Sequence, residues 1–382
     1  MRLTHNYRNI NAGAFVPMSI GTSATRGMYI PKYTITTTIL RQIGQVEAAR
    51  EVIENAPLIP SWEARFQDDA RVRVVHYGTA LEGNDLTLSQ AKIILEGGEI
   101  VARDRDIQEI INYRKVLDYI EKLADDKTNL VYSREILQDL HKLVTDKIIP
   151  DNQVGEFRET AVVLKNSVTG EIGFRPPTFI EVPFLIDDFL RFLNSEYGKK
   201  EHPVLRAAIT HYVLAAIHPF VEGNGRTARA LATLVLFSEG YDIKRLFALE
   251  EYFDKHADEY FGALMQVSNQ SRKLEDRDLT PWLEVFTKAL AIELSKVKEK
   301  VRELSVDIKI KEKHGHQIAL TPRQITLVEY LNANGEINMA VARKLLSMVS
   351  EDTILREFKY LTENGIVDKK GSTKAARYIL KK

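Results

Sequence analysis

Two stretches of apolar residues at helical spacing constrain the fold of this chain more than any other feature. The first, residues 203–217, carries Val204, Leu205, Ala208, Ile209, Tyr212, Val213, Ala216 and Ile217. A helix that is apolar over most of its circumference is buried inside a domain. The second begins near Asn224 and runs through Leu231, Leu234, Val235 and Phe237. The pattern predicts a helical domain with the helix at 203–217 near its centre.

Composition and charge fit a folded protein of two or three domains. The chain has 382 residues, of which 44% are hydrophobic, and 53 basic residues balance 53 acidic ones. Because the net charge is zero, any attraction for nucleic acid or membranes must come from a local patch. The absence of cysteine excludes disulfides, cysteine-bound zinc and a thiol nucleophile. No stretch approaches the ~20 apolar residues of a membrane span, and the polar N-terminus lacks a signal core, so we expect a cytoplasmic protein without a membrane partner.

Helical patterning begins at Thr34 and continues to about residue 300. Further helices are expected at residues 63–82, 104–124, 132–146, 180–197, 254–268 and 280–300, and residues 86–89 lead into another helix that runs through Ile93, Ile94 and Leu95 to Gly97. Residues 289–313 are rich in Lys and Glu, which suggests a long and partly solvated connecting helix.

Residues 154–177 interrupt this pattern. A β-prone run is followed by turn residues 166–170 and by a second strand at 172–175. We therefore predict a β-hairpin inserted into the helical domain. A lone hairpin is marginal in water, so it should lie against helices or wait for a partner strand. The first predicted strand consists of Thr160, Ala161, Val162, Val163 and Leu164.

Residues 320–382 have the pattern of a separate small domain. Helical patterns at 321–332, 338–346 and 351–363 precede two short strands around a basic loop, which is the order of a winged helix. The third helix of such a domain usually enters the DNA major groove, but here it opens with Glu351 and Asp352, which phosphate disfavours. The loop at 369–374 is basic. The sequence leaves both DNA contact and protein docking open.

The segment from His218 to Arg229 joins the two apolar helices through a polar turn. The glycines of Gly223–Gly225 allow positive φ, and their N–H groups can converge on an anion at the start of the next helix. Arg226 and Arg229 share a face in its first turns, where the helix dipole disfavours cations by ~0.3–1 kcal/mol each. Polyphosphate would compensate, because arginine binds phosphate oxygens well.

Glu222 and His218 add a metal ligand and a base to this anion site. Glu222 alone would repel phosphate, but Mg²⁺ is often held by one carboxylate together with substrate oxygens. His218 carries an imidazole, which suits proton transfer near neutral pH. A zinc pair is disfavoured because Pro219 and the glycines break the helix that it needs, and no clear third ligand appears. The loop therefore suits nucleotidyl transfer to a hydroxyl.

The stretch from His218 to Arg229 resembles the signature loop of Fic (filamentation induced by cAMP) proteins, and the resemblance covers most of residues 35–300. Weaker matching elements are Gly155–Arg158, Pro176–Pro177 and Asp278–Trp282. The resemblance implies an all-α Fic core with the hairpin as an inserted flap, and a small C-terminal winged-helix α+β domain. We expect an N-terminal helical region at 1–100, a catalytic domain at 101–300, a helical linker at 301–319 and the winged helix at 320–382.

What the resemblance implies is a protein adenylyltransferase that moves AMP from ATP to a Ser, Thr or Tyr hydroxyl of a protein. His218 would deprotonate that hydroxyl, and Glu222 would hold Mg²⁺ between the α- and β-phosphates. Phe220 would be a buried anchor of the loop. The flap strand at 160–164 would pair with a strand of the target protein.

The same resemblance assigns the phosphates to the start of the second apolar helix. The N–H groups of Gly223, Asn224 and Gly225, together with Arg226, would stabilise the leaving pyrophosphate. Arg229 would bind the γ-phosphate.

Residues Thr79–Asn84 resemble the Fic inhibitory motif, a helix whose glutamate reaches the second arginine of the loop. Glu82 would neutralise Arg229 and deny it to the γ-phosphate, so that ATP binds in a poor orientation. There is one departure from the family pattern. Gly78 stands four residues before Glu82, where the family usually has Ser or Thr. This difference predicts a less firmly anchored inhibitory helix.

Other interpretations stay open at this point. The same core could use Glu82 to position water and remove AMP from a modified protein, or it could use another nucleotide. The chain could also be a DNA-binding regulator whose Fic domain senses nucleotide. Self-modification and homodimer formation are compatible with the sequence as well.

Overall fold

The computed structural model describes residues 27–56, 58, 60–126, 130–165, 172–304, 320–347, 349–371 and 376–381. The chain divides into two compact units. The first contains the described residues up to Glu54 and Asp68–Lys298, and the second contains Asn55–Gln67 and the residues from Glu299 onward. Most of the described residues are helical, as the sequence predicts.

Helices make up most of the first unit. They are α1 (Thr37–Glu54), the later part of α2 (Pro60–Ala80), α3 (Leu88–Leu95), α4 (Asp104–Asp125), α5 (Arg134–Thr145), α6 (Val182–Asn194), α7 (Pro203–Ile217), α8 (Asn224–Ser238), α9 (Leu249–Lys255), α10 (Ala257–Ser268) and α11 (Thr280–Leu304) up to Lys298. The short helix α9 is absent from our prediction, which places a helix only from residue 254. Residues 305–313 of the predicted connecting helix lie outside the described residues.

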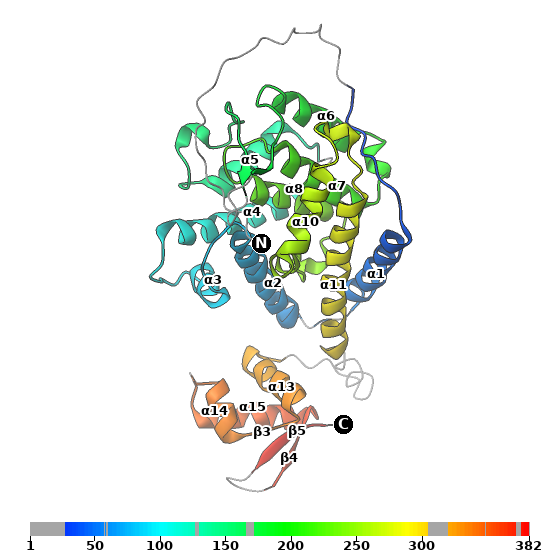
Figure 1. The fold of residues 1–382 in the computed structure, drawn as a ribbon. Coiled ribbons are helices and arrows are strands. Elements are labelled where there is room, and N and C mark those ends of the chain that lie inside the picture. Colours follow the sequence, from blue (N-terminus) through cyan, green and yellow to red (C-terminus); the bar gives the residue numbers. More distant parts are fainter. Residues whose placement is uncertain are drawn as a thin grey trace, which may run out of the picture. The chain divides into compact units, whose positions relative to one another are not determined.

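Helices α7 and α8 occupy the middle of the first unit, beside α4 and α5 (Figure 1). Every residue of α7 except Pro203 and Ala215 is buried, which confirms the predicted central helix. On another side of α7, the indole N–H of Trp282 in α11 donates to the carbonyl of Ala208 at 2.7 Å. Tyr260 of α10 is hydrogen-bonded to His211 of α7 at 3.0 Å. The loop between α7 and α8 is therefore held by a packed set of helices.

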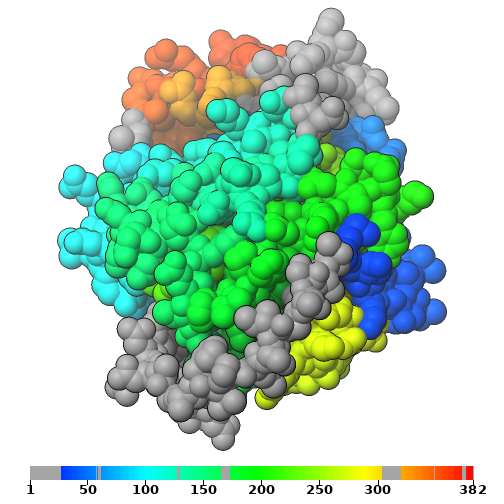
Figure 2. All heavy atoms as spheres, turned by 90° about the horizontal axis from the view of Figure 1, so that it is seen from above, coloured from blue at the N-terminus to red at the C-terminus, as the bar shows by residue number. Residues whose placement is uncertain are grey.

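Two short strands interrupt the helices, β1 (Leu164–Lys165) and β2 (Ile172–Phe174), and they pair antiparallel. The prediction of a strand over residues 160–164 is wrong in its extent, because the strand starts at Leu164. The predicted turn at 166–170 lies outside the described residues. In the space-filling view of Figure 2, teal to green residues, which include α5 and α6, form much of the visible face of the first unit.

The second unit combines helices with a small sheet. It contains α13 (Pro322–Asn334), β3 (Glu336–Asn338), α14 (Met339–Leu345), α15 (Glu351–Glu363), β4 (Val367–Lys370) and β5 (Arg377–Leu380). The strands form an antiparallel sheet in the order β3-β5-β4, and β3 is absent from our prediction. Phe358 stacks on Tyr378 with 3.9 Å between ring centroids, and Trp62 from the start of α2 belongs to the same core.

No helix among the described residues is long and apolar enough to cross a membrane.

Candidate active site

The loop that joins α7 to α8 is fixed by its own side chains. Helix α7 ends at His218, whose φ of 52° and ψ of 59° are left-handed, and α8 begins after Gly223, whose φ is 77°. Phe220 is fully buried, as predicted. The side chain of Asn224 accepts from the N–H of Phe220 at 2.9 Å and donates to its carbonyl at 2.8 Å. Asn224 therefore closes the loop by hydrogen bonds across Phe220.

His141 of α5 is a second support of this loop, and no sequence motif predicts it. Its ring stacks on Phe220 at 3.7 Å between centroids, with 5° between the ring planes. Its Nδ1 accepts from the N–H of Gly155 at 2.9 Å, so the proton lies on Nε2, which donates to the carbonyl of Glu222 at 2.9 Å. Burial lowers the pKa of His141 to about 4, which keeps this neutral form at physiological pH.

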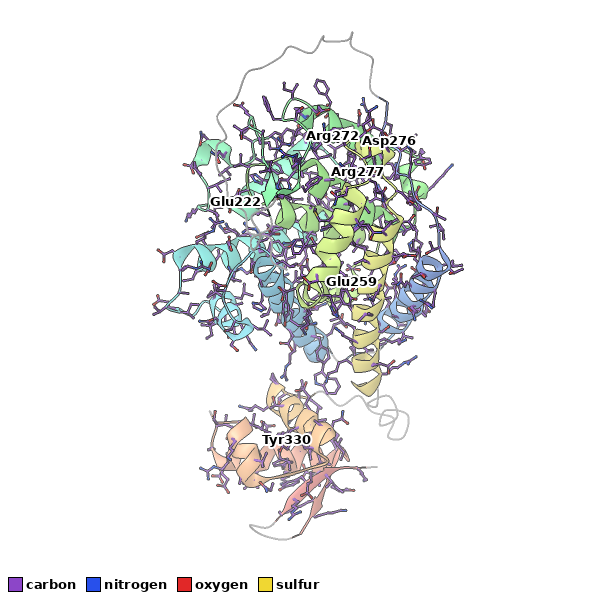
Figure 3. The ribbon with its side chains drawn as sticks, in the orientation of Figure 1. Glu222, Glu259, Arg272, Asp276, Arg277 and Tyr330 are labelled. Carbon is purple, nitrogen blue, oxygen red and sulfur yellow. The ribbon has the colours of Figure 1, made fainter. Side chains whose placement is uncertain are left out.

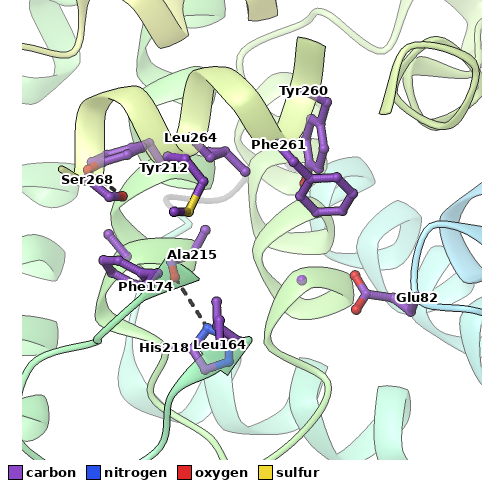
Figure 4. Close-up of a pocket in the computed structure, with 13 residues that line it drawn as sticks. Glu82, Leu164, Phe174, Tyr212, Ala215, His218, Tyr260, Phe261, Leu264 and Ser268 are labelled. Atoms are coloured by element: carbon purple, nitrogen blue, oxygen red, sulfur yellow. Dashed lines mark hydrogen bonds between the residues drawn. The ribbon is translucent and has the colours of Figure 1, made fainter. Parts of the chain in front are cut away.

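His218 adopts a defined orientation at the end of α7. Its side chain is buried among the residues that line a pocket, and Nδ1 lies 3.3 Å from the carbonyl of Ala215. A carbonyl can only accept, so Nδ1 carries a proton, and in a neutral imidazole Nε2 is then the nitrogen with the lone pair. Figure 4 shows this hydrogen bond at the edge of the pocket. When it is neutral, the imidazole so oriented presents Nε2 as the basic nitrogen, as a general base requires.

Glu222 and Arg226 belong to a cluster of charges between the loop and α4. Arg226 lies 3.1 Å from Glu109 and 3.8 Å from Glu222, and only 3% of its side chain is exposed. Arg105, at the start of α4, pairs with both Glu222 and Glu109. Figure 3 places Glu222 on the side of the first unit where α4 and α5 lie. The predicted metal ligand is therefore held by cations in this structure.

This region could bind a metal ion only together with the phosphate oxygens of a substrate. Among the described residues, no group of three or more His, Asp or Glu side chains could hold a metal ion by itself. Magnesium is commonly bound by one or two carboxylates together with phosphate oxygens and water. The carboxylate of Glu222, which is 15% exposed, fits that arrangement and does not fit a metal site made of protein alone.

Arg229 is buried and paired with Glu82, the contact that the sequence predicts. Its Nη2 lies 2.9 Å from the Glu82 carboxylate and donates to the carbonyl of Gly78 at 2.8 Å. Its Nη1 lies 3.4 Å from the hydroxyl of Tyr260. Burial acts to lower the pKa of Arg229, but Tyr260 and Glu82 outweigh it and raise the value, so the guanidinium stays charged.

The Glu82 carboxylate also lies against the start of α8. A Cβ atom added to Gly225 would overlap Glu82 Oε1. The first turn of a helix attracts anions because its N–H groups lack partners within the helix. An internal carboxylate thus occupies the place where the resemblance puts the phosphates.

The segment that carries Glu82 is anchored through its neighbours. The amide of Asn84 donates to Glu109 and to the carbonyl of Asp106, both at 3.0 Å. Gly78 is required by packing, because an added Cβ would lie 2.7 Å from Cε1 of Tyr113. Gly78 therefore gives Arg229 a carbonyl and leaves room for the Tyr113 ring, where the family pattern has a hydroxyl.

A partly open pocket extends from this charged region. Glu82 lies at one end in Figure 4, Tyr212 and Ser268 lie at the other, and His218 lies between them. Leu164 of β1 and Phe174 of β2 line one wall, and Leu264 and Met265 of α10 line another. The far end is mostly apolar and has hydroxyl groups. The lining of the pocket suits an organic ligand with a flat apolar part and an anionic part.

The profile of the Fic/DOC family matches residues 131–236, which contain α5, α6, α7, nearly all of α8 and the loop described above. The chain carries a Fic domain. Known proteins resemble it over a longer stretch. Protein adenylyltransferase Fic of Drosophila willistoni is 30% identical over 247 residues, which cover 63% of this chain and 48% of that protein. Its counterpart in Drosophila mojavensis is 31% identical over the same length, 47% of that protein. The chain thus spans about half the length of these relatives.

Solved structures of Fic proteins show the same fold. A Fic family protein from Desulfovibrio desulfuricans has a TM-score of 0.63 at 22% identity, covering 92% of this chain and 98% of that one. Residues 134–508 of Fic-1 from C. elegans give a TM-score of 0.54 at 23% identity, covering 71% of this chain and 73% of that one. At these identities the likeness concerns the fold alone.

The Fic domain brings most of the predicted site residues together, and the segment at 160–164 is only partly among them. Leu164 lines the pocket near His218, whereas Thr160 and Ala161 are exposed and Val162 and Val163 are half-buried outside the pocket. Arg158 lies between this segment and the loop and binds the carbonyls of Thr160 and His218. The sequence signal for it was the Gly155–Arg158 element, to which we assign no role from sequence.

Proposed function

We propose that the protein transfers AMP from ATP to a hydroxyl side chain of a target protein, and that Glu82 inhibits the reaction. The observation that carries this proposal is the Glu82 carboxylate at the start of α8, paired with the buried Arg229 at 2.9 Å. A buried cation at a helix N-terminus requires an anion. For Arg229 this anion is the carboxylate of Glu82, a side chain from another part of the chain.

In this proposal the nucleotide lies along the pocket. The adenine base of ATP would lie between Phe174 and Met265, with the hydroxyls of Tyr212 and Ser268 near its polar edge. The phosphates would follow toward the start of α8, and the γ-phosphate would take the place of Glu82 at Arg229. We assign the hairpin the role of a flap that aligns a strand of the target.

The chemical step needs one base and charge stabilisation. His218 Nε2 would accept the hydroxyl proton while the hydroxyl oxygen attacks the α-phosphorus. The bond from that phosphorus to the bridging oxygen of the β-phosphate would break, and pyrophosphate would leave with the electron pair. Glu222 would hold Mg²⁺, whose charge offsets that of the α- and β-phosphates. The N–H groups of Gly223, Asn224 and Gly225, with Arg226, would stabilise the pyrophosphate.

The test compares label transfer from ATP carrying the label on the α-phosphate. We expect the Glu82→Gly variant to label itself or a protein of a cell lysate at least about tenfold more than wild type, since ~1.4 kcal/mol of released barrier suffices for that factor. His218→Ala in the Glu82→Gly background should remove the label. Glu96→Gly is a matched control, because Glu96 also ends a helix before a glycine of positive φ, Gly97.

The alternatives give different results in the same assay. Labelling by another nucleotide in the absence of labelling by ATP would show that the donor is wrong. Release of AMP from a protein that already carries it, faster with wild type than with Glu82→Gly, would indicate removal of AMP. Labelling that persists in His218→Ala would refute the assignment of the base.

We assign the second unit to the winged-helix class on the order of its helices and strands. Its third helix, α15, opens with the exposed acids Glu351 and Asp352, so protein docking is the favoured role. Retention of DNA by the full chain at physiological salt, lost without residues 320–382, would overturn that choice.

A further inference from the structure

Arg158 is a buried arginine whose side chain, among the described residues, donates its hydrogen bonds to backbone carbonyl oxygens. It is 3% exposed. Nε donates to His218 at 2.7 Å, Nη1 donates to Thr160 at 3.0 Å, and Nη2 donates to Pro177 at 2.5 Å and more weakly to Ile217 at 3.4 Å. The backbone N–H of Arg158 donates to the carbonyl of Pro219 at 2.9 Å. Burial lowers the pKa of Arg158 to about 10, so it remains charged at neutral pH.

The carbonyls that Arg158 binds come from two different parts of the site. Thr160 and Pro177 stand at the two ends of the segment that carries β1 and β2. His218 and Ile217 stand at the C-terminal end of α7. The carbonyl of His218 has an unusual direction because this residue is left-handed, at φ 52°. One planar guanidinium thus joins both ends of the hairpin segment to the backbone of His218, the proposed general base.

We infer that Arg158 is a positioning residue that sets the hairpin and the His218 imidazole in one fixed register. The inference rests on the proposed function, in which the hairpin aligns the target strand and His218 accepts the proton of its hydroxyl. If the hairpin moved by itself, the hydroxyl would shift away from the imidazole. With Arg158 in place, the two parts move together or not at all. Arg158 acts through the backbone and does not line the pocket.

Lysine cannot replace this arrangement. Arginine presents five N–H donors in a rigid fork, whereas lysine presents a single ammonium on a flexible stem. An Arg158→Lys variant keeps the charge and can bind some of the carbonyls, but it cannot hold both ends of the segment and His218 together. A misplacement of about 1 Å in a catalytic geometry lowers rates by about 10²-fold. ATP binding should fall less than label transfer, because the hairpin supplies only Leu164 and Phe174 to the pocket, and the wall from α10 and the start of α8 does not depend on Arg158.

The experiment uses the full chain with Glu82→Gly as background, and adds Arg158→Lys or, as matched control, Arg206→Lys. Arg206 is equally buried, at 2%, and binds Glu239 and the carbonyl of Leu193 away from the site. Label transfer from α-labelled ATP to the acceptor of the parent variant should fall about 10²-fold for Arg158→Lys, mainly in kcat. It should fall far less for Arg206→Lys. Equal losses in the two variants would overturn the inference.

Two further measurements separate this inference from the proposed function. Hydrogen exchange of peptides covering 159–165 and 216–220 should rise together in Arg158→Lys and stay at parental values in Arg206→Lys. This readout needs no transfer, so an absence of labelling in the parent would refute the proposed function while exchange still decides the role of Arg158. Exchange that rises in one peptide only would refute the coupling. Methylguanidinium added to Arg158→Ala should restore protection of both peptides.

Discussion

The position of the Glu82 carboxylate can be tested by a double-mutant cycle with Gly225. A Cβ on Gly225 would overlap Glu82 Oε1, and it would lie 3.2 Å from Nη1 of Arg229. Gly225 lies within α8, and its φ is outside the left-handed range, so its backbone accepts alanine. In a helix that change alone should stabilise by ~0.5–1 kcal/mol. In this chain it must instead push Glu82 away from Arg229.

The expected magnitudes follow from burial. The side chains of Arg229 and Glu82 are 2% and 12% exposed, and removing one partner of such a pair costs ~3–5 kcal/mol. Because Arg229 keeps the carbonyl of Gly78 and the hydroxyl of Tyr260, we expect ~3 kcal/mol for Glu82→Ala. Gly225→Ala should lower the free energy of unfolding by ~2 kcal/mol, because the loss of the Glu82–Arg229 pair is partly offset by the higher helix propensity of alanine. The double variant should also cost ~2–2.5 kcal/mol, which is ~2.5 kcal/mol less than the sum.

Urea unfolding followed by tryptophan fluorescence measures these values. The chain has two tryptophans, so Trp62→Phe in the second unit leaves Trp282 as the reporter of the first. Gly262→Ala in α10 is the control, because an added Cβ there meets nothing within 4 Å and should add to Glu82→Ala independently. Additivity of Glu82→Ala and Gly225→Ala within ~0.5 kcal/mol, or stabilisation by Gly225→Ala alone, would refute this placement of the carboxylate.

Three other predictions concern the surroundings of the loop. Arg105→Ala should lower the Mg²⁺ concentration needed for ATP binding, measured by calorimetry, because Arg105 competes for Glu222; an unchanged requirement would contradict this. The fold keeps His141 neutral by lowering its pKa from 6.5 to about 4, so protons bind the unfolded chain first. Stability should therefore fall by up to ~3 kcal/mol from pH 6.5 to about 4 in urea titrations, and this loss should be smaller in His141→Asn. Gly78→Ser should destabilise the first unit by ~1–3 kcal/mol by crowding Tyr113, and an unchanged unfolding midpoint would contradict it.

The sequence predicts most helices of this chain well, because the apolar residues at helical spacing that indicate a helix lie within the helix itself. The limits of α7 and α15 agree with the sequence to the residue, since Pro203 and the αL His218 bound one and Ser350 caps the other. The helix α9 was not predicted, because its seven residues are too few to show a helical spacing of apolar residues. The strand β1 was placed too early because β propensity is a local property, whereas the extent of a strand depends on its partner, and β2 consists only of Ile172–Phe174.

The supports of the site were harder to predict than the site. The loop residues are consecutive, so their roles can be read together. His141 and Arg158 act across 81 and 60 residues of chain, and their partners are backbone carbonyls, which any residue provides. No sequence pattern encodes such a partner. The Glu82–Arg229 contact, 147 residues apart, was predicted only through resemblance to a motif.

The charges around the loop suggest why the resting chain is stable without its proposed substrates. Arg226 and Arg229 both lie near the N-terminus of α8, where the helix dipole disfavours cations. Arg226 pairs with Glu109, and Arg229 pairs with Glu82. Glu222, the proposed magnesium ligand, has a cation of its own in Arg105. Each proposed substrate charge therefore meets one competitor: the γ-phosphate must displace Glu82, and magnesium must displace Arg105. Removing Glu82 should strengthen ATP binding without changing the competition at Glu222, and a Glu82→Gly variant with an altered magnesium requirement would show that the two competitions are not separate.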